Sequence, residues 1–456
     1  MTSAVAIGGA AGFAGDRTDA AAPLVDALAR FDGPRFLMFE TLAERTLALS
    51  QLERRSDPGK GYNPALTRFV GPVLERCLRH GIRIVGNFGA ANPQAAAERI
   101  LAMAREAGFA SARVAVVQGD DIRAALTPAE LAARETDGKI LQGANDIVAA
   151  NVYLGAAPIA EALDQSADVV VTGRVADSAL ALGPLMHALR WRDNDWDRLA
   201  AGTLAGHLLE CGSQVTGGYF ADPPFKNVPG MAELGYPIVE IDDAGHMVVT
   251  KPPATGGRVD RLTVIEQTLY EIHDPAAYLA PDVVLDISGV RVEEIGTDRV
   301  RVTGARGKPK PETLKATVCV DGGVLGEAEI SYAGPNAMAR ARLAAEVIRE
   351  RMAKRAPGLR IRADAIGVTS VLGDNSGVFA RTANDAPDDI RLRFAAQSSD
   401  TSQVELLLDE VEALYCAGPA GGAGVRRRLT PRLASASCLI ERELVHPRVV
   451  MLGGGA

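Results

Sequence analysis

The sequence predicts an α/β protein: an N-terminal Rossmann-like parallel sheet with helices on both faces, followed by a C-terminal α+β domain of the ferredoxin-like, split βαβ type. Three observations predict it. Short apolar runs alternate with longer amphipathic stretches over the first half, which is typical of a parallel sheet covered on both faces. From about residue 240 the apolar residues alternate with period two. From about residue 320 the pattern reads strand, helix, strand, strand, helix, strand.

The first region, residues 1–240, is predicted as an α/β domain with site loops at its strand ends. Its predicted strands are the apolar runs 4–7, 35–39, 82–85, 113–117 and 169–171. Amphipathic stretches at 93–107 and 155–163 are the predicted helices between them. Each strand is followed by glycine or polar residues, so the predicted loops are rich in groups that can contact a ligand.

The second half is predicted to contain a β-rich connecting segment at 241–320 and a ferredoxin-like domain at 321–456. A turn at 242–246 and the alternating run 299–302 indicate hairpin strands in the connecting segment. The last domain is predicted from strands at 326–332, 360–371, 389–395 and 438–445, with helices at 336–354 and 401–415.

Composition excludes several classes of protein. The chain has 456 residues, 47% hydrophobic and 23% charged, with a formal net charge of −8, so no nucleic-acid partner is expected. Five scattered cysteines without a C-x-x-C pair predict a reducing, cytoplasmic location and no metal site. No apolar run is long enough for a membrane helix, so no membrane partner is expected.

Cofactor motifs are weak. The glycines at 8–12 do not spell G-x-G-x-x-G, and the chain contains no P-loop. The cofactor is therefore left undetermined.

Polar residues follow the predicted strands, where the loops of an open α/β sheet meet and ligands bind. We therefore predict an active site there; the alternative is that the same residues cap helices and form turns. The candidates are Arg17, Asn87, Asn92, Asp120, Asp121, Arg174, Asp177 and Ser178.

A second group of candidates lies at 206–218. His207, Glu210 and Cys211 share one face if the segment is helical, which would suit either a His-activated cysteine nucleophile or part of a metal site. The alternative is that Cys211 is an inert buried thiol. The neighbouring substrate-binding candidates are Gln214, Thr216, Gly217 and Gly218.

Lys251 precedes a stiff turn that contains Thr255, Gly256 and Gly257. A lysine at such a turn can hold a carboxylate or phosphate, or it can be a solvated side chain at a strand end. Because Thr-Gly-Gly also occurs at 216–218, the two turns are predicted to approach one ligand.

These segments together resemble the acyclic terpene utilisation (AtuA) family over residues 4 to 370. The resemblance is carried by Gly15-Asp16-Arg17, Leu42-Ala43-Glu44-Arg45-Thr46, Asn92-Pro93, Gly119-Asp120-Asp121, Tyr153-Leu154-Gly155-Ala156, Gly173-Arg174-Val175-Ala176-Asp177-Ser178, Gly206-His207-Leu208-Leu209-Glu210-Cys211-Gly212, Thr216-Gly217-Gly218 and Thr250-Lys251-Pro252. It implies catabolism of acyclic isoprenoids through acyl-CoA thioesters. It also implies a small α+β module, which we expect as a separate partner protein.

Three functions follow as hypotheses. The first is a lyase acting next to a carbonyl of a small carboxylate or acyl-CoA, with Asp120, Asp121 and Asp177 as acid and base. Arg17, Arg174 and Lys251 would hold the substrate's negative charge. The second is a thioester or amide hydrolase or acyltransferase that uses Cys211 and His207. The third is a non-catalytic subunit that works with the small partner; in every case we expect a homo-oligomer.

Overall fold

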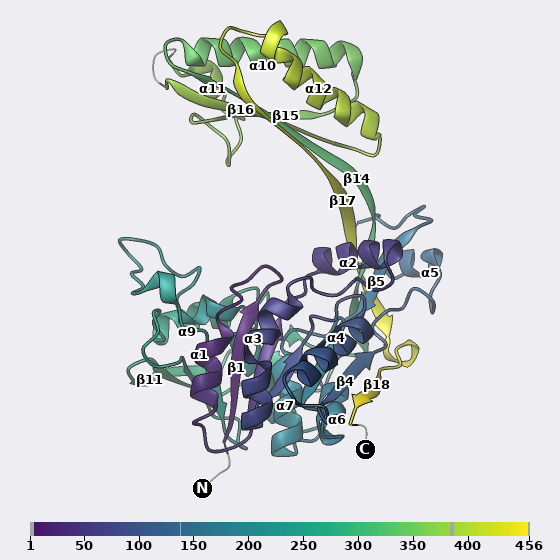
Figure 1. Cartoon of the computed structure of the whole chain (residues 1–456), viewed down its shortest axis with the longest axis vertical. Helices are drawn as coiled ribbons and strands as arrows, with labels where there is room; N and C mark the ends of the chain where they lie inside the picture. The colour runs from purple at the N-terminus through teal and green to yellow at the C-terminus, as the bar shows by residue number, and fades with distance from the viewer. Residues whose placement is uncertain (1–3, 137, 384–386, 455–456) are drawn as a thin grey trace. The chain divides into compact units, whose positions relative to one another are not determined.

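The chain folds into two compact units in a computed structural model that describes residues 4–136, 138–383 and 387–454. The larger unit comprises Met1–Cys319 and Ser435–Ala456, and the smaller unit comprises Val320–Ala434 (Figure 1). The chain is thus a mixed α/β protein, with a large mixed sheet in its larger unit.

The centre of the larger unit is a set of parallel strands in the order β1-β2-β3-β6-β4. Their side chains are almost all buried and rich in valine and isoleucine, as expected where helices cover both faces. The bounds are β1 (Val5–Gly12), β2 (Arg35–Glu40), β3 (Arg83–Gly86), β6 (Val169–Thr172) and β4 (Arg113–Gln118).

Antiparallel strands extend this sheet at both edges, so the sheet is mixed where the sequence predicts a parallel one. The reason is the short turn at 242–246, which reverses the chain and pairs Ile238 with Thr250. The added strands are β7 (Ile238–Ile241), β8 (Met247–Thr250), β12 (Arg299–Thr303) and β11 (Arg291–Gly296) beside β1, and β18 (Arg448–Gly453) beside β4.

Helices cover both faces of the parallel strands. Buried residues of three helices share one core with alternate strand residues such as Leu37 and Ile84: α1 (Ala21–Leu28), α3 (Leu66–His80) and α4 (Pro93–Glu106). The other face is covered by α6 (Ala157–Asp164), α7 (Ala179–Leu189) and α8 (Trp196–Glu210).

The chain changes direction within this sheet around β6. The chain runs from β3 through α4 to β4, but these two strands are not neighbours in the sheet. After α6 the chain returns, and β6 pairs between β3 and β4. Because α4 and α6 lie on opposite faces, the chain leaves the ends of β3 and β4 toward opposite faces of the sheet. Such a reversal leaves a crevice beyond the carboxyl ends of the strands, where ligands of open α/β sheets bind.

The rest of the larger unit surrounds these ends. Strand β5 pairs with β14, and β13-β10-β9 form a small antiparallel sheet. The bounds are α2 (Glu44–Ser56), α5 (Pro128–Ala132), β5 (Ile147–Val152), α9 (Arg261–Leu269), β9 (Tyr278–Leu279), β10 (Val284–Asp286), β13 (Arg306–Lys308), β14 (Thr313–Ala333), and the 3-10 helices η1 (Gly212–Thr216), η2 (Met231–Glu233) and η3 (Arg442–Leu444).

The smaller unit is an antiparallel sheet in the order β15-β16-β14-β17. Buried residues of α10 and α12 pack on one face of it, against Ile330, Leu392 and Phe394. On the other face Arg393 bridges Glu327 and Asp364. The remaining bounds are α10 (Ala337–Arg355), β15 (Ile361–Ile366), α11 (Val378–Arg381), β16 (Asp389–Ser398), α12 (Thr401–Ala417) and β17 (Ala423–Glu441).

Within the described residues, no helix combines the length and the apolar character needed to cross a bilayer.

Two glycines, one in β1 and one in α3, give different stability predictions. A Cβ at Gly12 would lie 2.4 Å from the carbonyl carbon of Cys211, whereas one at Gly71, inside α3, would meet no atom closer than 3.8 Å. We expect Gly12→Ala to lower the free energy of unfolding by about 1–3 kcal/mol through overpacking. Gly71→Ala should change it by less than about 1 kcal/mol, because the helix preference of alanine is offset by the contact of its Cβ with the ring of Pro72, the next residue. Chemical denaturation measures both, and an equal effect of the two substitutions would contradict the packing described.

Candidate active site

The loops that follow β4 and β6 meet at the carboxyl ends of the parallel strands, and glycine permits their close approach. A Cβ at Gly173 would lie 2.7 Å from Oδ2 of Asp120 and 3.0 Å from the carbonyl oxygen of Ala90. Real Cβ atoms essentially never come within 3.0 Å of another heavy atom. A side chain at position 173 would therefore push these loops apart.

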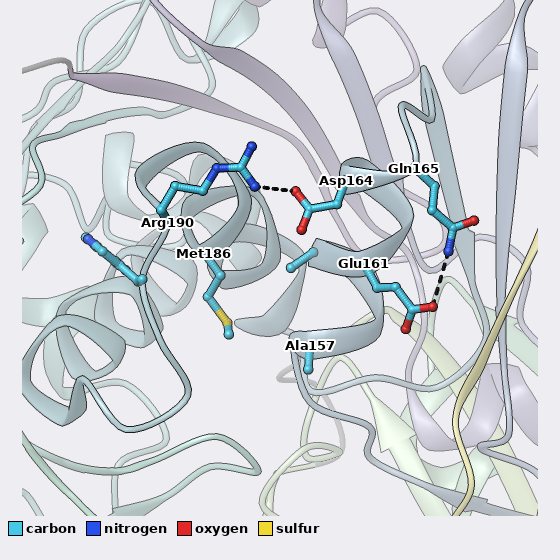
Figure 2. Close-up of a pocket in the computed structure, with 8 residues that line it drawn as sticks. Ala157, Glu161, Asp164, Gln165, Met186 and Arg190 are labelled. Atoms are coloured by element: carbon cyan, nitrogen blue, oxygen red, sulfur yellow. Dashed lines mark hydrogen bonds and ion pairs between the residues drawn. The ribbon is translucent and has the colours of Figure 1, made fainter.

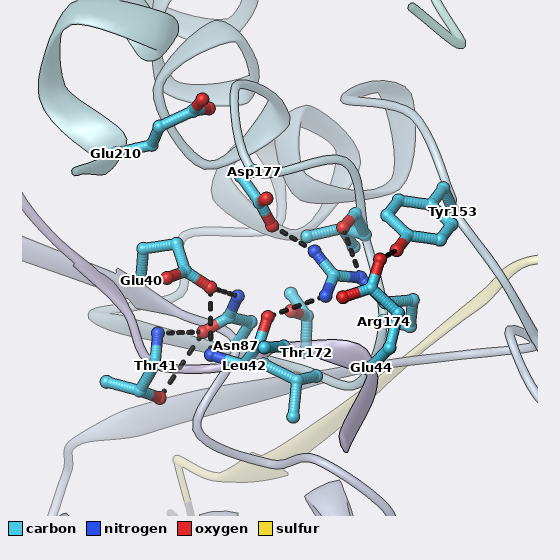
Figure 3. A network of polar contacts seen from close by, with 12 residues as sticks. Glu40, Thr41, Leu42, Glu44, Asn87, Tyr153, Thr172, Arg174, Asp177 and Glu210 are labelled. Atoms are coloured by element: carbon cyan, nitrogen blue, oxygen red, sulfur yellow. Dashed lines mark hydrogen bonds and ion pairs between the residues drawn. The ribbon is translucent and has the colours of Figure 1, made fainter. Parts of the chain in front are cut away.

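Arg174 lies at the centre of the site, and its side chain is 1% exposed. Its guanidinium donates to the carbonyl oxygens of Val175 (2.9 Å) and Leu42 (2.6 Å) and to Asp177 (Figure 3). The ring of Tyr153 lies 4.3 Å from the guanidinium carbon. The charge is therefore fully compensated within the protein, as a buried charge requires.

Asp120 links the loop that follows β4 to the loop that contains Arg174. Its Oδ2 accepts from the backbone N–H of Arg174 at 2.9 Å and from the side-chain amide of Asn151 at 2.8 Å. Burial raises the pKa of Asp120 to about 6, although these two hydrogen bonds lower it. Asp120 thus ties the ends of β4, β5 and β6 together.

Glu40 and Asn87 form a second buried pair, at the ends of β2 and β3. The Asn87 amide donates to Oε1 of Glu40 at 2.7 Å, and its oxygen accepts from the backbone N–H of Thr41 at 2.7 Å. Burial raises the pKa of Glu40 well above its ordinary value, and the negative charge of Asp177 raises it further. Glu40 therefore has a strong tendency to hold a proton.

Asp177 is partly open to solvent, since its side chain is 35% exposed. Its enclosed position raises its pKa to about 7; Arg174 lowers the value, and the charges of Glu210 and Glu44 raise it. Asp177 can therefore give or take a proton near neutral pH.

Tyr153 and Glu44 form the wall beside Arg174. The Tyr153 hydroxyl donates to Glu44, and the ammonium of Lys315 lies 3.7 Å from the same carboxylate and 4.8 Å from the centre of the Tyr153 ring. Burial raises the pKa of Glu44, but the tyrosine hydrogen bond and the charges of Arg174 and Lys315 outweigh it, so the pKa is lowered. The surroundings thus favour ionisation of Glu44 and oppose ionisation of Glu40.

The end of α8 supplies His207, Glu210 and Cys211. His207 contacts Glu210 at 3.0 Å and the carbonyl oxygen of Gln267 at 2.9 Å, so both ring nitrogens are engaged. Burial raises the pKa of the Cys211 thiol, and the charge of Glu210 raises it further. This environment keeps Cys211 protonated, which disfavours a nucleophilic thiolate.

Three strand-end candidates make contacts away from this centre. Arg17 donates to the carbonyl oxygens of Ala232 and Met231. Asn92 caps α4 and donates to the carbonyl oxygens of Pro58 and Lys60. Asp121 forms a surface ion pair with Arg123.

Ser178 packs directly against α8. A Cβ at Gly206 would lie 2.5 Å from the Ser178 carbonyl oxygen, so this contact holds α7 and α8 together. The Gln214 and Cys211 side chains both lie close enough to Tyr270 to influence its pKa. Both residues thus border the site from the α8 side.

The two Thr-Gly-Gly turns contact each other. Gly217 and Gly218 lie in the turn that begins at Thr216, whose carbonyl oxygen accepts from the N–H of Arg258 at 2.9 Å. A Cβ at Gly256 would lie 2.0 Å from the Gly230 carbonyl oxygen, and one at Gly257 2.5 Å from that of Thr216.

Lys251 is held beside the second turn. Its ammonium donates to the Thr255 carbonyl oxygen at 2.9 Å and pairs with Asp298 at 3.2 Å. Thr255 and Asp298 therefore bind the Lys251 ammonium, which the sequence predicts to bind a carboxylate or phosphate of the substrate.

Four further residues lie around this arginine although they are not among the predicted site residues: Glu40, Glu44, Tyr153 and Lys315. The sequence does place the two glutamates at a strand end, because Glu40 is the last residue of β2 and Glu44 begins α2. Tyr153 lies in a segment that carries the family resemblance, but it is the pairing of β5 with β14 that brings it beside Lys315.

Among the described residues, no group of three or more His, Cys, Asp or Glu side chains is arranged to hold a metal ion. A separate surface pocket lies on α6 and α7 (Figure 2). It is lined by Ala157, Ala160, Glu161, Asp164, Gln165, Met186, Arg190 and Trp191. None of the candidate residues lines it.

Carboxyl groups with raised pKa values around a buried arginine, at the strand ends of a mixed sheet, define an α/β protein with a candidate acid–base site. The family model described as "Acyclic terpene utilisation family protein AtuA" matches residues 5–451. The chain belongs to this family, and membership suggests a role in acyclic terpene utilisation. Comparison with the curated proteins found none that matches the chain.

The buried carboxyl of Asp120 leads to a prediction about how stability depends on pH. Its pKa is raised from an ordinary 3.8 to about 6, so ionisation costs more in the folded chain than in the unfolded one. The stability that the protonated form retains at low pH is therefore lost as pH rises through 6. We expect Asp120→Asn, which stays neutral, to gain up to about 3 kcal/mol relative to wild type between pH 4 and pH 8.

Urea denaturation across this pH range measures the difference. Asp121→Asn is the matched control, because its carboxylate lies at the surface; its effect should stay below about 1 kcal/mol at every pH. An Asp120→Asn difference that does not change with pH would contradict the buried, proton-holding carboxyl.

Proposed function

We propose that the chain is a catabolic enzyme, a lyase that adds or removes water, or cleaves a carbon–carbon bond, next to a carbonyl group. Its substrate is a small carboxylate or acyl-CoA from the degradation of isoprenoids or of branched or hydroxy acids. One observation carries this proposal: Asp177, a solvent-accessible carboxyl whose pKa is raised to about 7, hydrogen-bonded to the buried Arg174 at the strand ends. Family membership supports the pathway.

The chemistry of such a lyase requires groups that exchange protons near neutral pH. Asp177 meets this requirement, and its hydrogen bond to Arg174 fixes its direction. Asp120 is enclosed by Arg174 and Asn151, so we assign it to positioning rather than to proton transfer.

Negative charge develops on the carbonyl oxygen when the neighbouring carbon loses a proton. A protonated carboxyl can donate a hydrogen bond to that oxygen, and Glu40 is the candidate because burial raises its pKa. The Lys315 ammonium, whose side chain is 50% exposed, is the candidate contact for a carboxylate or phosphate of the substrate. Arg174 is already occupied by protein groups.

The contacts weigh against the cysteine hydrolase or acyltransferase, since His207 is engaged by Glu210 and Gln267 and burial raises the pKa of Cys211. The non-catalytic subunit that works with a small α+β partner remains the competing hypothesis. It predicts binding of acyl-CoA without turnover.

The fold assignment also has a finer form that we propose here. The element order and the sheet order β15-β16-β14-β17 support a ferredoxin-like smaller unit. The parallel strands with helices on both faces support a Rossmann-like centre of the larger unit.

Removing the acid–base group should abolish turnover. We expect Asp177→Asn to lower kcat/KM by about 10²–10⁴, the usual contribution of a positioned acid or base. The substitution also removes the ion-pair partner of the buried Arg174, so it should lower the free energy of unfolding, and activity is measured on protein shown to be folded. The assay follows loss or gain of water by mass spectrometry over a panel of branched acyl-CoA thioesters and short hydroxy acids. Asp164→Asn, at the surface pocket on α6, is the control; full activity of Asp177→Asn would refute the proposal.

Removing the Cys211 thiol should change turnover little. We expect Cys211→Ala to keep turnover within a few-fold of wild type on the same panel, because the raised pKa of Cys211 leaves it protonated. Iodoacetamide should leave wild-type activity intact at neutral pH. Loss of all activity in Cys211→Ala would restore the hydrolase hypothesis.

A further inference from the structure

His207 is locked in one orientation by α9. Its Nε2 lies 2.9 Å from the carbonyl oxygen of Gln267, and the Gln267 side-chain amide donates back to the His207 carbonyl oxygen at 3.1 Å. A carbonyl oxygen can only accept, so Nε2 carries a proton. The side chain is 1% exposed, so water does not compete for this contact.

The other ring nitrogen faces Glu210, with 3.0 Å between Nδ1 and Oε1. Since Nε2 already holds a proton, a proton in this second contact makes either an imidazolium beside a carboxylate or a neutral ring beside a carboxylic acid. Burial lowers the pKa of His207, but the hydrogen bond and charge of Glu210, the Gln267 carbonyl and the charge of Glu271 outweigh it and raise the pKa. The contact therefore favours the imidazolium and the carboxylate.

Glu210 also lies near Asp177 (Figure 3), and its charge raises the pKa of Asp177. The other charged groups that act on Asp177 are Arg174 and Glu44, and Glu40 lies within range of its charge. The ring of Tyr278 lies 6.0 Å from that of His207 and completes the surroundings. Two carboxyls thus lie near each other in unequal surroundings: Glu210 contacts His207, and Asp177 is paired with Arg174 and repelled by Glu210.

We propose that His207 is a positioning residue that holds and directs the Glu210 carboxylate, so that Glu210 takes the substrate proton while Asp177 gives one. This assignment of a base and an acid depends on the proposed lyase function and identifies its two proton-transfer groups. Unequal environments around paired carboxyls are the usual way in which one becomes the base and the other the acid.

For removal of water, the step balances as follows. The Glu210 carboxylate takes the proton from the carbon next to the carbonyl, and the electrons of that C–H bond form the C=C bond. The C–O bond to the hydroxyl breaks, and Asp177 gives its proton to the departing oxygen, which leaves as water. Glu210 ends protonated and Asp177 ionised, so one proton returns from Glu210 to Asp177, through solvent or across the site, before the next turnover.

The charge state of His207 can be measured without any substrate. We expect ¹⁵N NMR of the full chain, with His207 assigned by comparison with His207→Gln, to show both ring nitrogens protonated at pH 7 and pH 8. In Glu210→Gln the ring should lose the Nδ1 proton at pH 7 and keep that on Nε2. A neutral wild-type ring at pH 7, or an imidazolium that survives in Glu210→Gln, would overturn the proposal.

A pH profile separates this role from a merely structural one. In His207→Gln we expect the acidic limb of kcat/KM to move to higher pH by about one unit or more. A structural role would lower the rate equally at every pH, and an unshifted acidic limb would overturn the proposal even if Glu210→Gln fails to fold. Failure of the lyase proposal itself is recognised separately, by full activity of Asp177→Asn.

Discussion

The buried guanidinium of Arg174 is the constraint on which the rest of the site depends. A charge removed from water must find compensation nearby, and this one finds it in Leu42 after β2, in its own loop after β6, and in the ring of Tyr153 beyond β5. Groups from several strands are therefore fixed around one cation. Asp120 holds the backbone of Arg174 from below, so the arrangement is rigid on both sides.

The carboxyls around this cation differ in their surroundings, not in their chemistry. Glu40 is enclosed and its pKa is raised, whereas the hydrogen bond from Tyr153 and two cations lower the pKa of Glu44. Asp177 lies between these extremes because Arg174 attracts its charge and Glu210 repels it. The carboxyls around Arg174 can thus include a proton donor and a proton acceptor at the same pH, which is a requirement for acid–base chemistry.

Much of this arrangement could be predicted from the sequence, because loops at the ends of parallel strands meet. That rule places Asn87, Asp120, Arg174 and Asp177 together, and the structure brings them together. The rule cannot distinguish residues that contact a ligand from residues that only hold loops in place. Lys251 has the sequence context of a ligand contact but is paired with Asp298. Nor can it give strand order, which sets the reversal around β6 and the meeting of Tyr153 with residues of β14.

Strand β18 pairs with β4 in antiparallel register, and Arg448 lies opposite Gln118, 330 residues upstream. During synthesis on the ribosome, β4 therefore emerges long before the strand that covers its outer side. Until β18 arrives, the backbone amides of β4 present an unpaired border to other nascent chains, a known hazard for aggregation. The strand that leads to Asp120 is thus protected late in biogenesis, and chaperone demand should fall once β18 has docked.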